Sequence, residues 1–239
     1  MSKHFHRSRL VRLLADTTLL EANASRQDFA QRMSLWLNAA DTVRLHAVLQ
    51  PLPPAAPSRA GALPRHELAT RLSEALRALE AQFTQAIAHD TLGLLQDREE
   101  LASGYGTARK RHLDLQRQME LKATPLRAQF RQAMARVSAP MRHLATLDAV
   151  MEQTLGPREQ KLLGLVPVFL EKRFEQLRRA SQNPADVTPA ETTPAGVVPA
   201  WLADFSQTWQ AVLGAELTHR LLPLQGLVDA MNSEEETTT

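Results

Sequence analysis

Apolar side chains recur every three or four residues along most of the chain, which is the spacing of one face of an α-helix. Three segments show the pattern most clearly, and each would form one apolar stripe. No segment shows sustained apolar–polar alternation rich in β-branched residues, so the sequence predicts an all-α fold. The stripes contain Leu68, Leu72, Leu76, Leu79, Phe83 and Ile87; Leu126, Phe130, Met134, Val137, Met141, Leu144, Met151 and Leu155; and Trp201, Leu202, Phe205, Trp209, Val212, Leu213 and Leu217.

Residues 8–50 predict an N-terminal unit of three short helices, the first of them capped by Ser8. Its opening stretch, SRLVRLLA, combines leucines with arginines and suits nucleic acid, a membrane surface or another helix. Asp16 lies one turn after Arg12 and would repel phosphate and anionic lipid. The pattern therefore favours docking of the first helix on the second.

Two proline-rich stretches divide the rest of the chain. Residues 51–64 predict a semi-extended linker, and residues 182–199 predict a flexible loop. The long amphipathic helices of residues 65–181 resemble coiled-coil segments and are expected to form an elongated bundle or a helical hairpin. A C-terminal helix over residues 200–232 is expected to pack on this bundle, and residues 233–239 are expected to be a disordered acidic tail.

Glycine and proline predict where the long helices are interrupted. Gly104 and Gly106 indicate a turn, although a helix through both is an alternative. Pro140 is expected to kink the helix that carries the second stripe. Gly156 and Pro157 are expected to end that helix and begin the next one.

The longest apolar run, Leu162 to Leu170, reads LLGLVPVFL. It is about half the length needed to span a bilayer. We therefore expect a buried helix segment with an irregularity at Pro167, and no transmembrane segment.

Composition limits the classes of function. Hydrophobic residues make up 44% of the 239 residues, charged residues 23%, aromatic residues 5%, and there are only 9 glycines, as is typical of a folded protein of long helices. The net charge of +2 predicts no strong attraction to nucleic acid. Because cysteine is absent, disulfides, thiolate catalysis and cysteine-ligated metals are excluded, and the cytoplasm is favoured.

Few residue patterns suit catalysis or metal binding. Glu216 and His219 form a Glu-x-x-His pair, but a di-iron bundle needs two such pairs, so a solvated pair near a helix end is expected. His4 and His6 have no third ligand nearby, and the adjacent acids Glu99–Glu100 would diverge by about 100° on a helix. The sequence predicts no catalytic residue, metal or cofactor and identifies no small-molecule substrate, although a composite site of distant residues remains an alternative.

Arg127, Arg131 and Arg142 are the residues most suited to bind a partner. They follow one flank of the second stripe, and no acidic residue occurs between residues 125 and 144. This arginine ridge suits an acidic helix of the protein itself or of a second copy, an acidic partner, or, least of all, nucleic-acid phosphate. The other basic run, residues 108–112, is balanced by neighbouring acids and predicts a salt-bridged, solvent-exposed face.

The N-terminal region also resembles an uncharacterised proteobacterial family catalogued as a domain of unknown function. The resemblance covers residues 8–50 and lies in the SRLVRLLA opening, the SRQ-FA-R pattern of Ser25 to Arg32, the Trp36–Leu37 pair and Asp41. It implies no activity or catalytic residue. Members are often encoded beside an OmpA-like peptidoglycan-binding protein and a long membrane-anchored helical protein, which resembles the parts of a proton-driven envelope motor. The resemblance thus implies a cytoplasmic accessory of such an assembly.

Together these features predict a non-enzymatic, all-helical interaction protein of the bacterial cytoplasm. The amphipathic stripes must be buried against something, which favours self-association into an oligomer or binding to a helical partner. The alternative is a nucleic-acid-binding helical protein that uses the arginine ridge.

Overall fold

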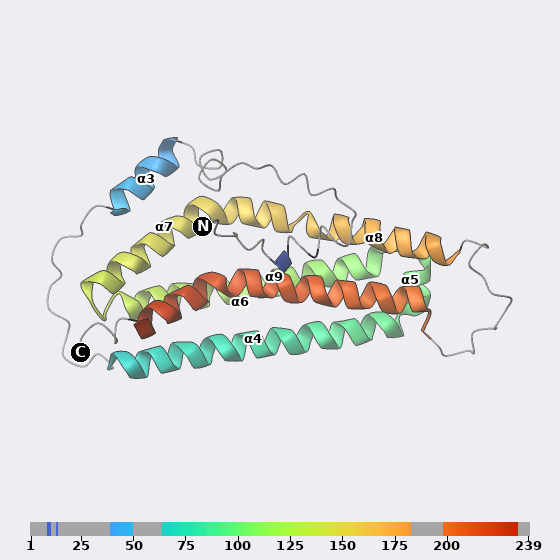
Figure 1. Ribbon diagram of the computed structural model, residues 1–239, viewed down its shortest axis with the longest axis horizontal. Helices are drawn as coiled ribbons and strands as arrows, with labels where there is room; N and C mark the ends of the chain where they lie inside the picture. The colour runs from blue at the N-terminus through green and yellow to red at the C-terminus, as the bar shows by residue number, and fades with distance from the viewer. Residues whose placement is uncertain (1–8, 11–12, 14–38, 50–63, 183–197, 234–239) are drawn as a thin grey trace, which may run out of the picture. The chain divides into compact units, whose positions relative to one another are not determined.

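The computed structural model describes residues 9–10, 13, 39–49, 64–182 and 198–233 (Figure 1). These residues contain helices and turns and no strand, which confirms the all-α fold. The helices are α3 (Ala39–Leu49), α4 (Arg65–Gln96), α5 (Arg98–Ser103), α6 (Gly106–Met134), α7 (Ala139–Leu163), α8 (Val166–Ser181) and α9 (Ala200–Ser233).

The chain divides into two compact units, each assembled from segments far apart in the sequence. In its described part, unit 1 comprises residues 9–10, 13, 81–120, 163–182 and 198–219. Unit 2 comprises residues 39–49, 64–80, 121–162 and 220–233.

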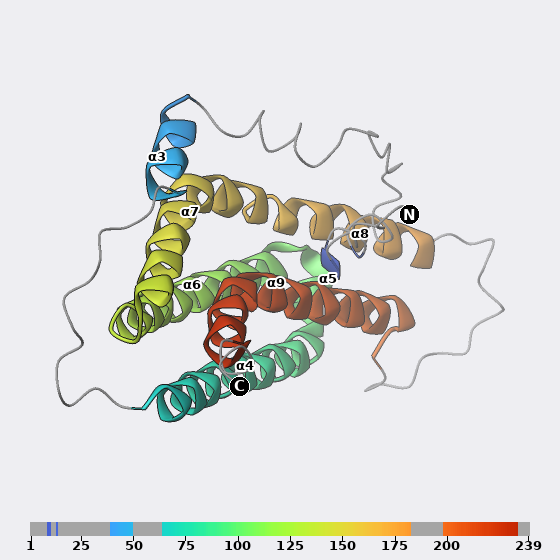
Figure 2. The ribbon, with the colours of Figure 1, turned by 60° about the vertical axis from the view of Figure 1, so that its left-hand side comes forward.

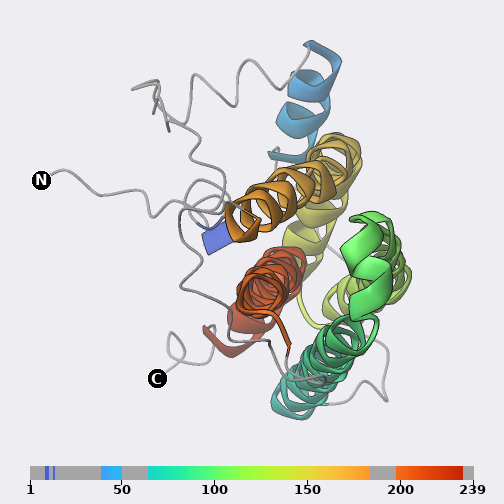
Figure 3. The ribbon, with the colours of Figure 1, turned by 90° about the vertical axis from the view of Figure 1, so that its right-hand side faces the viewer.

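Unit 1 has a core of aromatic and aliphatic side chains between α6, α8 and α9, which are seen nearly end-on in Figure 3. Phe174 of α8 is fully buried, and its ring centroid lies 5.7 Å from Tyr105, which immediately precedes α6, and 5.4 Å from Trp201 and 5.0 Å from Phe205 of α9. The ring pairs with the two α9 residues are edge-to-face, an arrangement that aromatic quadrupoles favour.

Unit 2 is held by apolar contacts and by polar contacts between its helices. Leu72, Leu76 and Leu79 on α4 are buried, as the first stripe predicts. Arg65 Nη2, at the start of α4, donates a hydrogen bond to the carbonyl of Ala230 on α9 (3.1 Å). The remaining buried apolar residues of the unit are Ala69, Phe130, Met134, Met141, Ala145, Leu221, Leu224, Leu227, Val228 and Met231.

Helix α3 lies beside α7 in unit 2 (Figure 2). Arg158 of α7 donates to the carboxylate of Asp41 in the first turn of α3 (3.4 Å). Asp41 is buried, so this pair ties the short helix to the unit.

The helix expected to carry the whole second stripe is interrupted earlier than predicted. Helix α6 ends at Met134, and the expected kink at Pro140 is wrong, because a turn over residues 135–138 precedes this proline. Ser138 Oγ accepts a hydrogen bond from the backbone N–H of Met141 (3.2 Å) and so caps α7. Pro140 then lies in the first helical turn, where its missing N–H costs little.

The expected boundary at Gly156 and Pro157 is also wrong. Helix α7 continues through both residues to Leu163. The carbonyl that Pro157 leaves without a helical donor belongs to Gln153, which is exposed and open to water. The turn expected around Gly104 and Gly106 is confirmed, because α5 ends at Ser103 and α6 begins at Gly106.

The apolar run from Leu162 to Leu170 differs in part from the expected buried helix. It is interrupted at Gly164 and Leu165, and α8 begins at Val166 with Pro167 in its first turn. Leu163, Val166 and Leu170 are buried, but Leu162 and Leu165 are about half exposed. No helix among the described residues is long and apolar enough to cross a membrane.

Several predicted segments fall wholly or largely outside the described residues. These are the first two helices of the N-terminal unit, the linker at 51–64, the loop at 182–199 and the tail at 233–239. The predicted C-terminal helix over 200–232 corresponds to α9, Ala200–Ser233, whose end also includes the first residue of the predicted tail.

Candidate functional site

A polar cluster lies in the core of unit 1, between α6 and α9. His112 and Gln116 are one turn apart on α6, and Glu216 comes from α9. His112 and Glu216 are completely buried, and Gln116 is 8% exposed. Such buried polar groups are tolerated when they satisfy one another.

Both carboxylate oxygens of Glu216 accept hydrogen bonds. His112 Nε2 lies 2.8 Å from Oε1, and Gln116 Nε2 donates to Oε2 over 2.7 Å. An ionised carboxylate only accepts, so with Glu216 in that form the shared hydrogen belongs to Nε2 of His112. Gln116 Nε2 also donates to the backbone carbonyl of Leu163 (3.0 Å).

The prediction for these residues is wrong in two respects. Glu216 is buried against His112 and is not part of a solvated pair with His219. His112, expected on a solvent-exposed face of the basic run, points into the core. A signal was present: Glu216 is seven residues after buried Trp209 on α9, and His112 lies four residues after buried Ala108 and three before buried Leu115 on α6. Both therefore occupy the buried apolar faces of their helices.

Four further buried polar atoms of unit 1 have no hydrogen-bond partner among the described residues. They are Nδ1 of His112, the hydroxyl of Tyr105, Nε1 of Trp209 and Nε of Arg173. Burial, together with the negative charge of Glu171, raises the pKa of Tyr105 well above its ordinary value of 10.0, and Glu216 acts in the same direction. Arg109 opposes this shift.

The raised pKa of Tyr105 predicts a loss of stability at alkaline pH. Above about pH 10 the phenol ionises in the unfolded chain, while the folded chain keeps its proton. The free energy of unfolding should therefore fall as pH rises above this value, and the fall should be smaller in Tyr105→Phe. Urea unfolding at neutral and alkaline pH measures the difference.

Tyr105 is the only tyrosine of the chain, so tyrosinate absorbance reports this residue alone. The native protein should develop the absorbance at a higher pH than the urea-unfolded protein. Coincident titrations would contradict the prediction.

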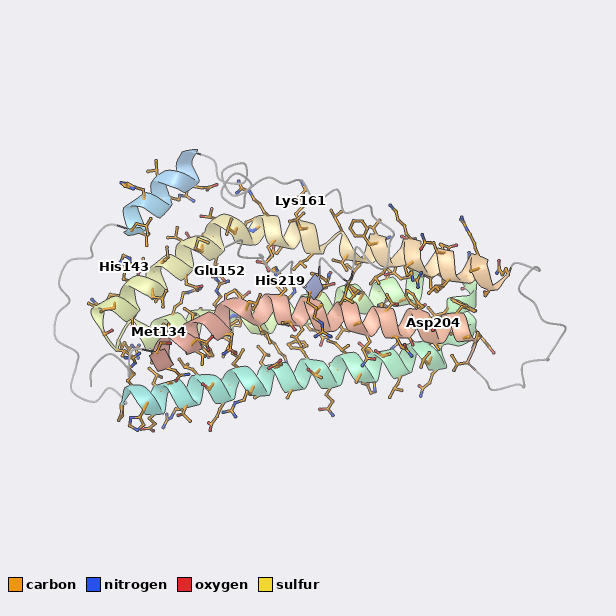
Figure 4. All side chains as sticks on the ribbon, in the orientation of Figure 1. Met134, His143, Glu152, Lys161, Asp204 and His219 are labelled. Atoms are coloured by element: carbon orange, nitrogen blue, oxygen red, sulfur yellow. The ribbon has the colours of Figure 1, made fainter. Side chains whose placement is uncertain are left out.

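The arginine ridge lies in unit 2, where two of its members share one pair of acids on α7. Arg127 donates to Asp148 through Nε (2.9 Å) and Nη2 (2.6 Å), and Arg131 donates to it through Nη1 (3.0 Å). Nη1 of Arg131 is also 2.7 Å from Glu152, which is labelled in Figure 4. These four side chains are largely buried and carry two charges of each sign.

The surroundings of Arg127 favour its charged form. Burial lowers the pKa of this guanidinium, but the hydrogen bond and charge of Asp148, with the charges of Glu152 and Glu159, outweigh burial and raise the pKa above its ordinary value. Arg127 is therefore a permanently charged member of an ion-pair cluster.

Arg142, the third residue of the ridge, bonds elsewhere. Its Nε donates to the carbonyl of Ala135 (3.3 Å), in the turn that follows α6. The structure thus brings Arg127 and Arg131 together, and Arg142 satisfies a backbone group at a helix end.

A hollow of about 690 Å³ lies at the end of α4 and beside α5 in unit 1. Its polar lining includes Asp97 and the adjacent acids Glu99 and Glu100. Asp97 forms an ion pair with Arg111, and Glu100 accepts from Thr107 Oγ1 (3.0 Å). The remaining lining residues are Leu92, Leu95, Gln96 and Val198.

Gly93 leaves room for the Arg111 guanidinium in its present position. A Cβ atom at this position would overlap the guanidinium of Arg111. Arg111 lies against α4 here and also reaches Asp90 (3.5 Å). Glycine, which weakens the apolar pattern of α4, therefore has a packing role.

The described residues contain no group of three or more histidine, aspartate and glutamate side chains that could hold a metal ion. His4 and His6 lie outside these residues.

Comparison with protein families identifies the chain. A family model described as a protein of unknown function (DUF3348) matches residues 2–233. The chain belongs to this family. The match extends far beyond residues 8–50, to which the resemblance in sequence was confined, and it includes the segments that form both polar clusters. No curated protein and no solved structure matched the chain.

Proposed function

We propose that this member of the family is a non-enzymatic interaction protein that binds a helical partner, either a second copy or another protein, through the first half of α8. The observation that carries the proposal is that this half-helix is apolar on two faces, of which one is packed. We assign no catalytic residue and no cofactor to the protein.

The packed face of α8 contains Val166, Leu170 and Phe174, all buried. On the other side Val168 is 39% exposed, and Leu165, which immediately precedes α8, is 47% exposed. A helix of a globular protein is ordinarily apolar on one face and polar on the other. Apolar side chains on both faces are typical of a helix that is packed on both, which favours a partner at Leu165 and Val168.

A photo-crosslinking amino acid at position 168, expressed in the native host, tests this proposal. We expect crosslinked adducts at position 168 and none at position 82, where Gln82 is an exposed polar residue of α4 in the same unit. A Val168→Glu exchange should reduce association of the purified chain in sedimentation experiments if the partner is a second copy. A monomer at all concentrations, together with no adduct at position 168, would contradict the proposal.

No observation in the described residues favours nucleic-acid binding. Arg127 and Arg131 are paired with acids of unit 2, and Arg142 bonds a backbone carbonyl, so phosphate would have to displace these contacts. A cytoplasmic location and a role beside an envelope assembly remain part of the proposal. The absence of cysteine supports the cytoplasmic location, and the resemblance of the N-terminal region supports both.

A further inference from the structure

The turn before α8 contains a backbone carbonyl that lacks its helical partner. In an uninterrupted helix the carbonyl of Leu163 would accept from the N–H of residue 167. Residue 167 is proline, which has no N–H. The carbonyl instead accepts from Gln116 Nε2 on α6 (3.0 Å). Leu163 is buried, so an unsatisfied carbonyl here would be costly.

The side-chain amide of Gln116 has two N–H groups, and both are used. One meets the carbonyl of Leu163, and the other meets Oε2 of Glu216 (2.7 Å). His112 occupies Oε1 of the same carboxylate, so the carboxylate is held at both oxygens. A hydrogen bond to a charged acceptor is shorter and stronger than one between neutral groups, and it fixes the orientation of the amide.

We propose that Gln116 and Glu216 form a charge-dependent latch that replaces the hydrogen bond missing at Pro167 and so fixes the turn that leads into α8. His112 is a positioning residue that orients the carboxylate. By fixing this turn, the latch determines the positions of the exposed side chains of Leu165 and Val168. It does not depend on the proposed function, because it concerns only contacts within unit 1.

A double-mutant cycle between positions 116 and 167 tests the latch in the full chain. Gln116→Leu should accelerate amide hydrogen exchange in residues 164–168 by about fivefold, the factor expected for one net hydrogen bond. In a Pro167→Ala background the new N–H can bond to the carbonyl of Leu163, so the same exchange should have a clearly smaller effect. Gln118→Leu, an exposed position on the same helix, is the control and should leave these residues unchanged.

Equal acceleration by Gln116→Leu in both backgrounds, or none in either, would overturn the proposal. Should Gln116→Leu fail to fold, Glu216→Gln provides a second test, because it keeps the size of the side chain and removes its charge. Relative to the unsubstituted protein, we expect amide exchange in Glu216→Gln to accelerate in residues 164–168 and to stay the same in residues 81–90 of α4. A folded Glu216→Gln protein with unchanged exchange at 164–168 would show that charge has no part in the latch.

Discussion

Replacing Phe174 with alanine is expected to lower the free energy of unfolding by about 3–5 kcal/mol, the range for a large aromatic side chain removed from a core. Phe174 is fully buried, and its ring contacts Tyr105, Trp201 and Phe205. The loss combines the lost burial of the ring with the cavity that three rigid aromatic neighbours cannot fill. Urea unfolding followed by far-ultraviolet circular dichroism measures the change.

The matched control is Phe169→Ala, on the same helix. Phe169 is only half-buried, and its ring has the Lys172 ammonium 5.9 Å from its centroid. Its removal should cost less than half as much as that of Phe174. Comparable losses for the two variants would mean that the aromatic cluster is not the core of unit 1.

Replacing Glu216 with leucine is expected to destabilise the protein by about 2–6 kcal/mol, because it leaves two buried donors without an acceptor, at about 1–3 kcal/mol each. The change leaves Nε2 of His112 and one N–H of Gln116 without an acceptor in a region closed to water. A surface glutamate should behave differently. Glu99→Leu, at an exposed position, should change stability by less than about 0.5 kcal/mol.

The cost should be non-additive with that of His112→Leu. The double variant removes donor and acceptor together, so the second exchange should cost much less than it does alone. Urea unfolding of the two single variants and the double variant gives the coupling. Strict additivity would show that the two side chains do not stabilise one another.

The all-α class could be predicted because the apolar spacing is long and regular. The row from Leu68 to Ile87 needs only helical geometry to place its members on one side, and five of its six residues are buried. Helix ends were harder to predict. Pro157 lies inside α7, whereas Pro140 lies in the first turn of the same helix, after the cap residue Ser138. Whether a proline interrupts a helix depends on whether the carbonyl that it leaves without a donor can bond to water or to a side chain.

The buried cluster could not be predicted from the order of residues, because its contacts are long-range. His112 and Glu216 are 104 positions apart. In the sequence, His112 belongs to a basic run, and Glu216 belongs to a Glu-x-x-His pair near a helix end. Their positions on the apolar faces of α6 and α9 were the available signal. A charged residue at such a position needs a partner, but only tertiary packing shows which one.

The arginine ridge shows a similar limit. Its flank on the helix follows from spacing alone, and an acidic helix of the same protein was one of the alternatives. The bonds of Arg127 and Arg131 to Asp148 follow only once α6 and α7 fold against each other. The acids lie just beyond residues 125–144, the segment whose lack of acidic residues left an internal helix, an acidic partner and phosphate as alternatives.

The bare backbone at Gly93 has an evolutionary consequence. Because a Cβ atom there would overlap the present position of the Arg111 guanidinium, which would have to shift, the two positions are expected to vary together among relatives. Relatives with arginine at position 111 should have glycine at position 93. Relatives with alanine or serine at position 93 should have a shorter or uncharged residue at position 111, and should lack the acids at positions 90 and 97 more often.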